Sequence, residues 1–102
     1  MFVYNVTIKI DPEIEKEWIE WMQKEHIPEV LSTGMFSENR FLRLLDLEEE
    51  DGLTFSAQYV TDSRDKYDQY IQLYAAELRK KGSERWGNRF IAFRTLMEEV
   101  VL

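Results

Sequence analysis

The sequence contains no cysteine, which excludes disulfide bonds, thiolate nucleophiles and zinc or iron–sulfur sites with sulfur ligands. This absence is typical of proteins in reducing compartments, so we expect a cytoplasmic protein of bacterial type. The first residues, 1–5, lack the basic region and long apolar run of a signal peptide. No segment approaches the roughly 20 apolar residues that cross a bilayer, so no membrane partner is expected.

Basic residues are in deficit. Thirteen lysines and arginines face twenty acids, which gives a formal net charge of −7. Such a chain repels phosphate backbones, so nucleic acid is excluded as a probable partner. Residues 1–51 carry 13 acids and 5 bases, whereas residues 52–102 carry 7 acids and 8 bases. Two copies could therefore pair an acidic half with a near-neutral half.

Glycine and proline are also scarce, with four and two copies. The glycines are isolated, so there is no Gly-rich phosphate loop, and neither a serine nucleophile elbow nor a cluster of metal ligands is present. The acidic run 48–51 lacks the alternating ligands of a calcium loop and is predicted to be a solvated turn. We therefore predict no cofactor and no metal.

The composition that remains is that of a globular protein. The chain has 102 residues, of which 44% are hydrophobic and 14% aromatic, and this indicates one domain spanning residues 1–102. Residues 2–10 alternate strictly between an apolar and a more polar face, which predicts a strand.

Two segments have helical spacing. The first begins with an N-cap and a first-turn proline at residues 11–12, should kink near residues 26–28, and should stop by Gly34. The second begins with a cap at residues 62–63 and is predicted to end at Gly82, with at most one further turn after it. The basic residues around its end suit the helix dipole and the acidic half of a partner subunit.

Further strands are predicted over residues 36–47, 53–60 and 89–101, with a hairpin turn at 48–52. The order β-α-β-β-α-β predicts an α+β fold of the ferredoxin-like type, in which both helices cover one face of a four-stranded antiparallel sheet. The second and fourth strands are apolar on both faces, and two helices cannot cover both. We therefore expect a homodimer in which a second copy covers the open face, forming a dimeric α/β barrel.

Several runs of residues also resemble a known family. These runs are Val3–Thr7, Trp18–Met22, Glu25–Val30, Thr33–Gly34 with Phe36, and Phe90–Glu98. Over essentially the whole chain they resemble a family of short, uncharacterised bacterial proteins, a domain of unknown function within the dimeric α/β-barrel superfamily. That superfamily includes cofactor-free monooxygenases, lactone isomerases, haem-handling enzymes and proteins without known activity. The resemblance implies the fold but selects no reaction.

The resemblance also points to His26. In several enzyme groups of the superfamily, a histidine followed two residues later by proline faces a pocket between helices and sheet, and His26 with Pro28 matches this spacing. His26 is the only histidine and the natural general acid or base near neutral pH. The alternative is a structural histidine that caps the helix end or hydrogen-bonds a carbonyl.

Candidate ligand-binding residues fall into two groups. On the open face of the sheet we expect Asn5, Thr7 and Gln58 with Ser56, joined by Arg43 and by Arg94 or Thr95, as a lining for an anionic or carbonyl-bearing ligand. Alternatively, these side chains satisfy one another across a dimer interface. On the apolar side of the first helix, Trp18 and Met22 would form a pocket wall beside His26, or else belong to the core.

Two functional hypotheses remain open at this stage. In the first, the homodimer binds a small aromatic or carbonyl-bearing metabolite, with His26 as the base for a cofactor-free proton shift or oxidation. In the second, the chain is a non-catalytic dimerisation or protein-interaction module. A lined cavity of roughly 300 Å³ or more beside His26 would favour the first hypothesis, and a closed, fully packed interior would favour the second.

Overall fold

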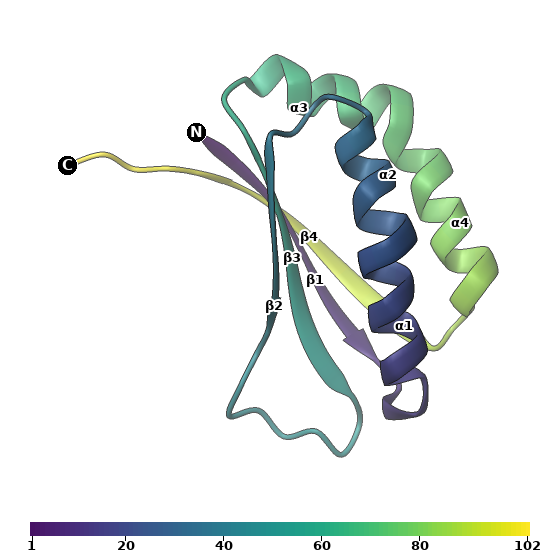
Figure 1. Ribbon diagram of the computed structural model, residues 1–102. Coiled ribbons are helices and arrows are strands. Elements are labelled where there is room, and N and C mark those ends of the chain that lie inside the picture. Colours follow the sequence, from purple (N-terminus) through teal and green to yellow (C-terminus); the bar gives the residue numbers. More distant parts are fainter.

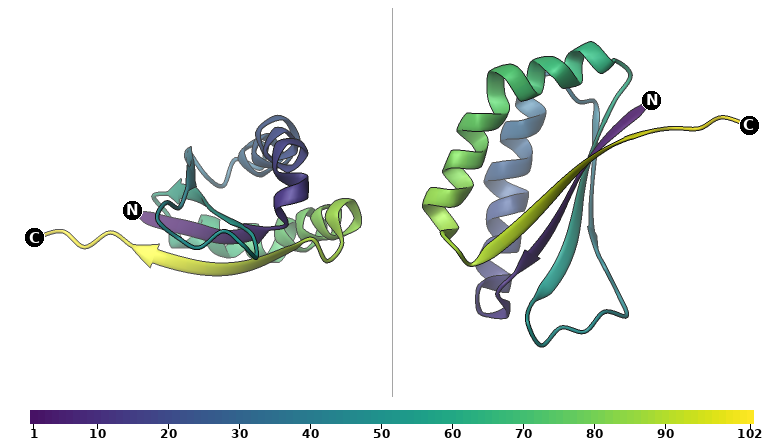
Figure 2. Two further views of the ribbon diagram at one scale, coloured as in Figure 1. Left: turned by 90° about the horizontal axis from the view of Figure 1, so that it is seen from below. Right: turned by 180° about the vertical axis from the view of Figure 1, so that it is seen from behind.

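A computed structural model describes residues 1–102 and shows two layers, a sheet and a pair of long helices (Figures 1 and 2). The strands are β1 (Phe2–Ile10), β2 (Glu38–Arg43), β3 (Leu53–Thr61) and β4 (Phe90–Glu98). They form one antiparallel sheet in the order β2-β3-β1-β4, with both helices on one face. The predicted α+β ferredoxin-like fold is confirmed.

The central strand β1 separates two chemically different faces. Its even-numbered residues turn toward the helices, where Tyr4, Ile8 and Ile10 are buried. They join a core of 17 buried apolar side chains between the sheet and the helices. The odd-numbered residues, including Asn5 and Thr7, lie on the other face, which no helix covers.

The first long helix runs through α1 (Glu15–Trp21), the π-helical turn η2 (Met22–His26) and α2 (Ile27–Ser32). It follows a short 3₁₀ helix, η1 (Pro12–Ile14). The Asp11 carboxylate caps the start of η1 by accepting a hydrogen bond from the Glu13 amide at 2.9 Å. In the π-helical turn the Ile27 amide donates to the Met22 carbonyl, five residues back. Pro28 has no N–H to continue the regular ladder, so the irregularity expected around residues 26–28 takes this form.

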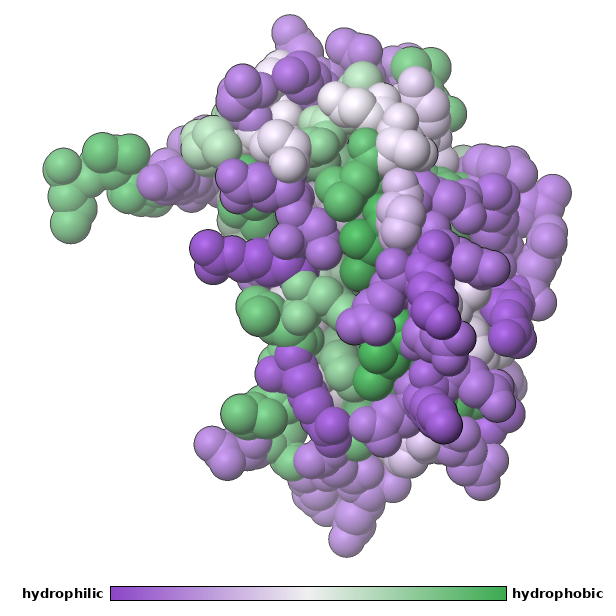
Figure 3. All heavy atoms as spheres, in the orientation of Figure 1, coloured by the Kyte–Doolittle hydropathy of each residue, from purple (hydrophilic) through white to green (hydrophobic).

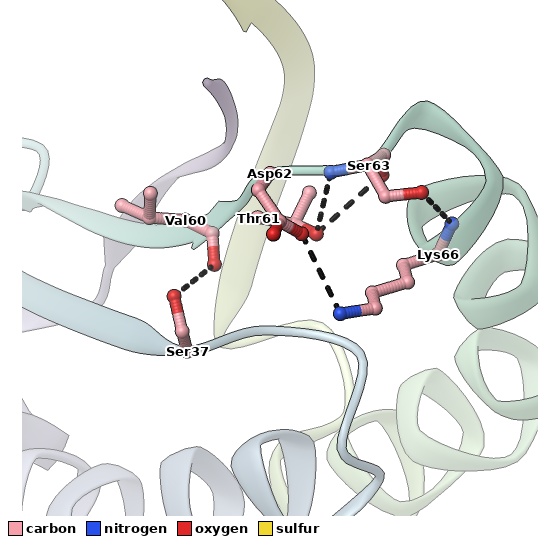
Figure 4. A network of polar contacts seen from close by, with 6 residues as sticks. All are labelled: Ser37, Val60, Thr61, Asp62, Ser63 and Lys66. Atoms are coloured by element: carbon pink, nitrogen blue, oxygen red, sulfur yellow. Dashed lines mark hydrogen bonds and ion pairs between the residues drawn. The ribbon is translucent and has the colours of Figure 1, made fainter.

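The second long helix comprises α3 (Arg64–Tyr70), the π-helical turn η3 (Ile71–Ala75) and α4 (Ala76–Trp86). Its start is fixed by Ser63, whose Oγ accepts from the Lys66 amide at 3.3 Å. Figure 4 shows this junction, where the Thr61 hydroxyl also accepts from the Ser63 amide and Lys66 Nζ lies 3.4 Å from the Asp62 carboxylate. The cap predicted at residues 62–63 is confirmed.

The expected end of this helix at Gly82 is wrong. The helix passes through Gly82 and ends at Trp86, and Gly87, with φ +59°, follows it. Gly82 is buried where the two helices and β4 approach one another, and a Cβ there would lie 3.7 Å from Trp21 Cη2 and 4.0 Å from Phe90 Cζ. The glycine therefore lies in the helix interior, where a Cβ would make only ordinary van der Waals contacts, and it does not mark a terminus.

Two strand boundaries also differ from the expectation. β2 covers only residues 38–43 of the predicted 36–47, because Asp46 adopts φ +58°, which an extended strand cannot accommodate. Leu45 and Leu47 consequently lie exposed in the loop before β3. β4 ends at Glu98, and residues 99–102 project away from the sheet as an extended tail (Figure 1).

The apolar side chains expected on the open face are present there. Both edge strands contribute: Leu42 from β2, and Ile91, Phe93 and Met97 from β4, each at least 39% exposed. The helix surfaces are mainly hydrophilic, whereas apolar atoms gather between β2 and the first helix and on the C-terminal tail (Figure 3).

The two glycines at the end of the second helix give opposite predictions. Gly82→Ala should stabilise the protein by about 0.5–1 kcal/mol, because the helix interior favours alanine and the added methyl group meets only ordinary contacts. Gly87→Ala should destabilise it by about 1–3 kcal/mol, because φ +59° with ψ −128° is strained for any other residue. Urea unfolding of both variants measures the two effects, and destabilisation by Gly82→Ala would contradict the packing described here.

Candidate functional site

A cavity of about 60 Å³ lies between the sheet and the helices. β1, β3 and β4 supply its floor and the two long helices its roof. Thirteen of its 17 lining residues are hydrophobic, among them the predicted pocket residues Trp18 and Met22, which are also buried in the core. No aspartate or glutamate lines it, although the chain has twenty acids. The cavity is therefore an apolar space that contains hydrogen-bond donors but no acidic acceptor.

His26 lines this cavity from the end of the π-helical turn η2. Its ring stacks on the Trp21 indole, with 4.9 Å between ring centroids and 20° between planes. Neither ring nitrogen takes part in any of the side-chain hydrogen bonds of the structure, and His26 makes no capping bond. The geometry thus lacks the carbonyl bond or helix cap that a purely structural histidine would make.

His26 is uncharged at neutral pH. Burial disfavours the imidazolium and lowers its pKa from 6.5 to about 4, while the nearby Glu29 opposes this change and Arg94 and Lys81 add to it. The ring consequently keeps a lone pair available for accepting a proton or a hydrogen bond. Its proton affinity rises if a negative charge is brought into the cavity.

Two buried polar atoms in the cavity wall have no partner. The Tyr59 hydroxyl on β3 and the Trp86 indole N–H at the end of α4 make no hydrogen bond within the protein. Burial also raises the pKa of Tyr59, so its hydroxyl keeps its proton and can donate. An unpaired buried polar group destabilises a fold by about 1–3 kcal/mol. Tyr59 and Trp86 both line the cavity, although the two unpaired atoms themselves have almost no accessible surface.

Arg94 and Arg43 lie on the other face of the sheet from the one expected. Arg94 is directly opposite Val6 of β1, and Arg43 opposite Phe55 of β3, so both side chains are on the helix face. Arg94 lines the cavity. Arg43 lies further along the sheet, where it contacts Glu15 at 3.1 Å and Glu49 at 2.6 Å. The expectation failed because alternation fixes which residues share a face but not which face turns inward.

The polar residues of the open face do lie together. Ser56 donates to the Asn5 side-chain oxygen at 2.6 Å, Asn5 donates to Thr7 Oγ1 at 3.0 Å, and Gln58 is opposite Asn5 in the register. Thr95 flanks Asn5 on the other side. The network satisfies most of its own hydrogen bonds and is on the opposite side of the sheet from His26. A ligand-binding role for Asn5, Thr7 and Gln58 stays a prediction.

Tyr59 and Arg79 are among the cavity residues that were not predicted from the sequence as site residues. The alternation of β3 places Tyr59 on its apolar face, but nothing in that pattern shows that the hydroxyl lacks a partner. From the sequence, Arg79 was explained by the helix dipole and by attraction to the acidic half of a partner subunit. In the structure its guanidinium donates to the Tyr4 hydroxyl at 3.2 Å. Only the three-dimensional packing shows that these residues share one space.

The family model of a domain of unknown function, DUF4286, matches residues 1–100. The chain belongs to this family. No protein with curated annotation matches the sequence. The resemblance noted from the sequence motifs is thereby confirmed, and the family description assigns no activity.

Several solved structures share the fold at low sequence identity. An ethyl tert-butyl ether D (EthD) family protein from Bacillus halodurans C-125 has a TM-score of 0.70 at 15% identity, covering 98% of this chain and 100% of its own. A dimeric ferredoxin-like protein from an uncultured marine organism has a TM-score of 0.60 at 14% identity, covering 100% and 95%. A Streptomyces coelicolor monooxygenase, from the ActVA-Orf6 gene and bound to nanaomycin D, has a TM-score of 0.61 at 18% identity, covering 99% and 90%. At these identities the similarity establishes the fold alone.

Two negative findings complete the description. No three or more His, Asp or Glu side chains are grouped so that they could hold a metal ion. None of the helices combines the length and the hydrophobicity needed to cross a bilayer.

The lowered pKa of His26 predicts a specific loss of stability on acidification. Between the folded value of about 4 and the unfolded value of 6.5, the unfolded state binds more protons, so stability falls as the pH decreases through this window. From neutral pH to about pH 5 the loss attributable to His26 should be on the order of 2 kcal/mol. Urea unfolding of the wild type and of His26→Gln at both pH values isolates this contribution. Equal pH dependence in the two proteins would contradict the assignment.

Proposed function

We propose that the protein binds a small carbonyl-bearing metabolite in the cavity between the helices and the sheet. The observation that carries this proposal is that one apolar cavity is lined by an uncharged His26 and by two residues with an unpaired buried donor, Tyr59 and Trp86. A carbonyl oxygen is the acceptor that both donors lack. Small-molecule sites commonly combine an apolar lining with a few convergent polar groups of this kind.

The volume decides between the ligand types suggested by the sequence. A cavity of about 150 Å³ accommodates a benzene ring, and sites for drug-sized ligands span about 300–1,000 Å³. At about 60 Å³ the cavity does not reach the roughly 300 Å³ expected for the ligand-binding hypothesis, and it is too small for an aromatic ring. A short aliphatic carbonyl compound is therefore favoured over an aromatic one.

The arrangement supports acid–base chemistry on such a ligand. A His26 nitrogen can accept a proton from the carbon beside the carbonyl, and the electron pair of that C–H bond then moves toward the carbonyl oxygen. One donor of the wall, the Tyr59 hydroxyl or the Trp86 N–H, would stabilise the enolate oxygen by hydrogen bonding. This favours a proton shift over the oxidation also considered from the sequence.

The variant Tyr59→Phe tests whether the Tyr59 hydroxyl binds a ligand or has a structural role. Removing the unpaired hydroxyl should raise the stability of the free protein by about 1 kcal/mol, because the phenyl ring and its contacts remain. The same change should weaken binding of a short-chain ketone such as butanone about fivefold, by loss of one hydrogen bond. Unfolding and calorimetric titration measure the two effects. A variant that is less stable while binding is unchanged would contradict the proposal, as would absence of saturable binding to the wild type.

We also propose that the protein is a homodimer whose open sheet faces pack against each other. Leu42, Ile91, Phe93 and Met97 form an exposed apolar surface on both edge strands, around the self-satisfied polar network at the centre. Ile91 and Phe93 are neighbours on this face of β4, and an exposed apolar patch of this kind commonly marks an interaction surface. One of the structural neighbours is described as a dimeric ferredoxin-like protein. This supports the proposal that a second copy of this chain covers the open face.

The second hypothesis from the sequence is that the chain is a non-catalytic dimerisation or protein-interaction module. The self-satisfied network of Asn5, Thr7 and Ser56 favours this candidate, because it leaves little polar capacity for a ligand on the open face. The two candidates differ in the cavity beside His26. Only the first requires it to be occupied.

Phe93→Glu tests the interface. Phe93 is 62% exposed at the open face, and a buried, unpaired carboxylate in a sheet-to-sheet interface would prevent association. We expect the wild type to have the mass of two chains by light scattering and the variant the mass of one. Leu73→Glu is the control, because Leu73 is 63% exposed on the second helix, away from the sheet. A monomeric wild type in dilute solution would contradict the proposed assembly.

A further inference from the structure

Two arginines at the cavity come from different layers of the fold. Arg94 extends from the edge strand β4, on the helix face, and Arg79 extends from α4 above it. Both residues line the cavity although each is largely exposed. They therefore stand where the cavity opens to solvent.

Neither arginine has a carboxylate partner. Arg79 donates only to the neutral Tyr4 hydroxyl, and Arg94 is absent from both the ion pairs and the side-chain hydrogen bonds. The contrast with Arg43 and Arg89 is marked, since each of these contacts two acids. In a chain with seven excess negative charges, two uncompensated cations thus lie beside one cavity that has no acidic residue in its wall.

Both arginines act on the pKa of the same residue, Tyr70. Burial is the main cause that raises the pKa of Tyr70, a cavity residue, and Arg79 and Arg94 both act against it. Arg94 also contributes to the lowered pKa of His26. The part of the cavity beside Tyr70 therefore lies in a positive local potential, whereas Glu29 acts in the opposite sense on His26.

We propose that the ligand is a short-chain oxo acid whose carboxylate binds between Arg79 and Arg94 while its carbonyl and alkyl end occupy the cavity. Guanidinium groups are the usual partners of carboxylates, because their planar array of donors matches the two oxygens. A cavity of about 60 Å³ has room for about four water-sized groups, which suits a branched alkyl end and a carbonyl. The inference rests on the proposed function and adds the charge and the size of the ligand.

The first experiment compares a charged ligand with its uncharged analogue. The probes are 3-methyl-2-oxobutanoate and 3-methyl-2-oxobutanamide, which differ mainly in the charge of the terminal group. Calorimetric titration of the wild type should show at least about tenfold tighter binding of the acid. Added salt should weaken binding of the acid and leave that of the amide nearly unchanged.

The second experiment removes the arginines. Arg94→Gln and Arg79→Gln should each reduce the preference for the acid by about tenfold, and Arg94→Lys should retain part of it. Binding of the amide reports whether each variant is folded, because it does not depend on the guanidinium charge. Lys16→Gln is the matched control, since it removes one exposed positive charge that has no ion pair.

The outcomes distinguish this inference from the proposed function. Equal binding of acid and amide would overturn carboxylate recognition while the carbonyl site remains supported. Failure of both probes to bind would overturn the oxo-acid ligand together with the binding function. Loss of the preference in Lys16→Gln as well as in the arginine variants would show a general effect of net charge and would also overturn the inference.

Discussion

The central strand β1 imposes the constraint on which the molecule depends. It is hydrogen-bonded along its whole length to β3 on one side and to β4 on the other, so its alternation fixes the chemistry of both faces of the sheet. Tyr4 and Ile8 are buried in the core beneath the helices, while Asn5 and Thr7 lie at the centre of the opposite surface. One face thus produces a core with a cavity, and the other produces a surface that lacks a cover.

Several polar groups around the cavity lack a hydrogen-bond or ion-pair partner, and all of them are donors. The π-helical turn η2 lets the first helix pass over the sheet with His26 turned inward, and Pro28 makes that turn compatible with the backbone hydrogen bonds. Buried hydrogen-bond donors are seldom unpaired in native interiors. Tyr59 and Trp86, which both line the cavity, nevertheless each carry an unpaired donor. Two arginines without acids stand at its opening. Such departures from full satisfaction concentrate at functional sites, and here they share one chemical character, an excess of donors.

The sequence predicted most of the fold because the strands alternate cleanly and the helix starts carry recognisable caps. Its failures have physical causes that a one-dimensional pattern does not contain. Gly82 looked like a helix terminus because glycine commonly occupies that place, but the helix continues through it to Trp86. Arg94 was assigned to the wrong face because β4 is apolar on both faces, and only its register with β1 decides its direction. The unpaired state of Tyr59 and Trp86 likewise requires knowledge of every neighbour.

The location of the bound ligand tests the central claim most directly. Intermolecular nuclear Overhauser effects from the methyl groups of 3-methyl-2-oxobutanoate can be measured on the labelled protein. We predict contacts to the Met22 methyl group, the Ala92 methyl group and the Trp86 indole, all of which face the cavity. Contacts to Thr7 and Gln58 on the opposite face of the sheet, with none to the cavity, would contradict it.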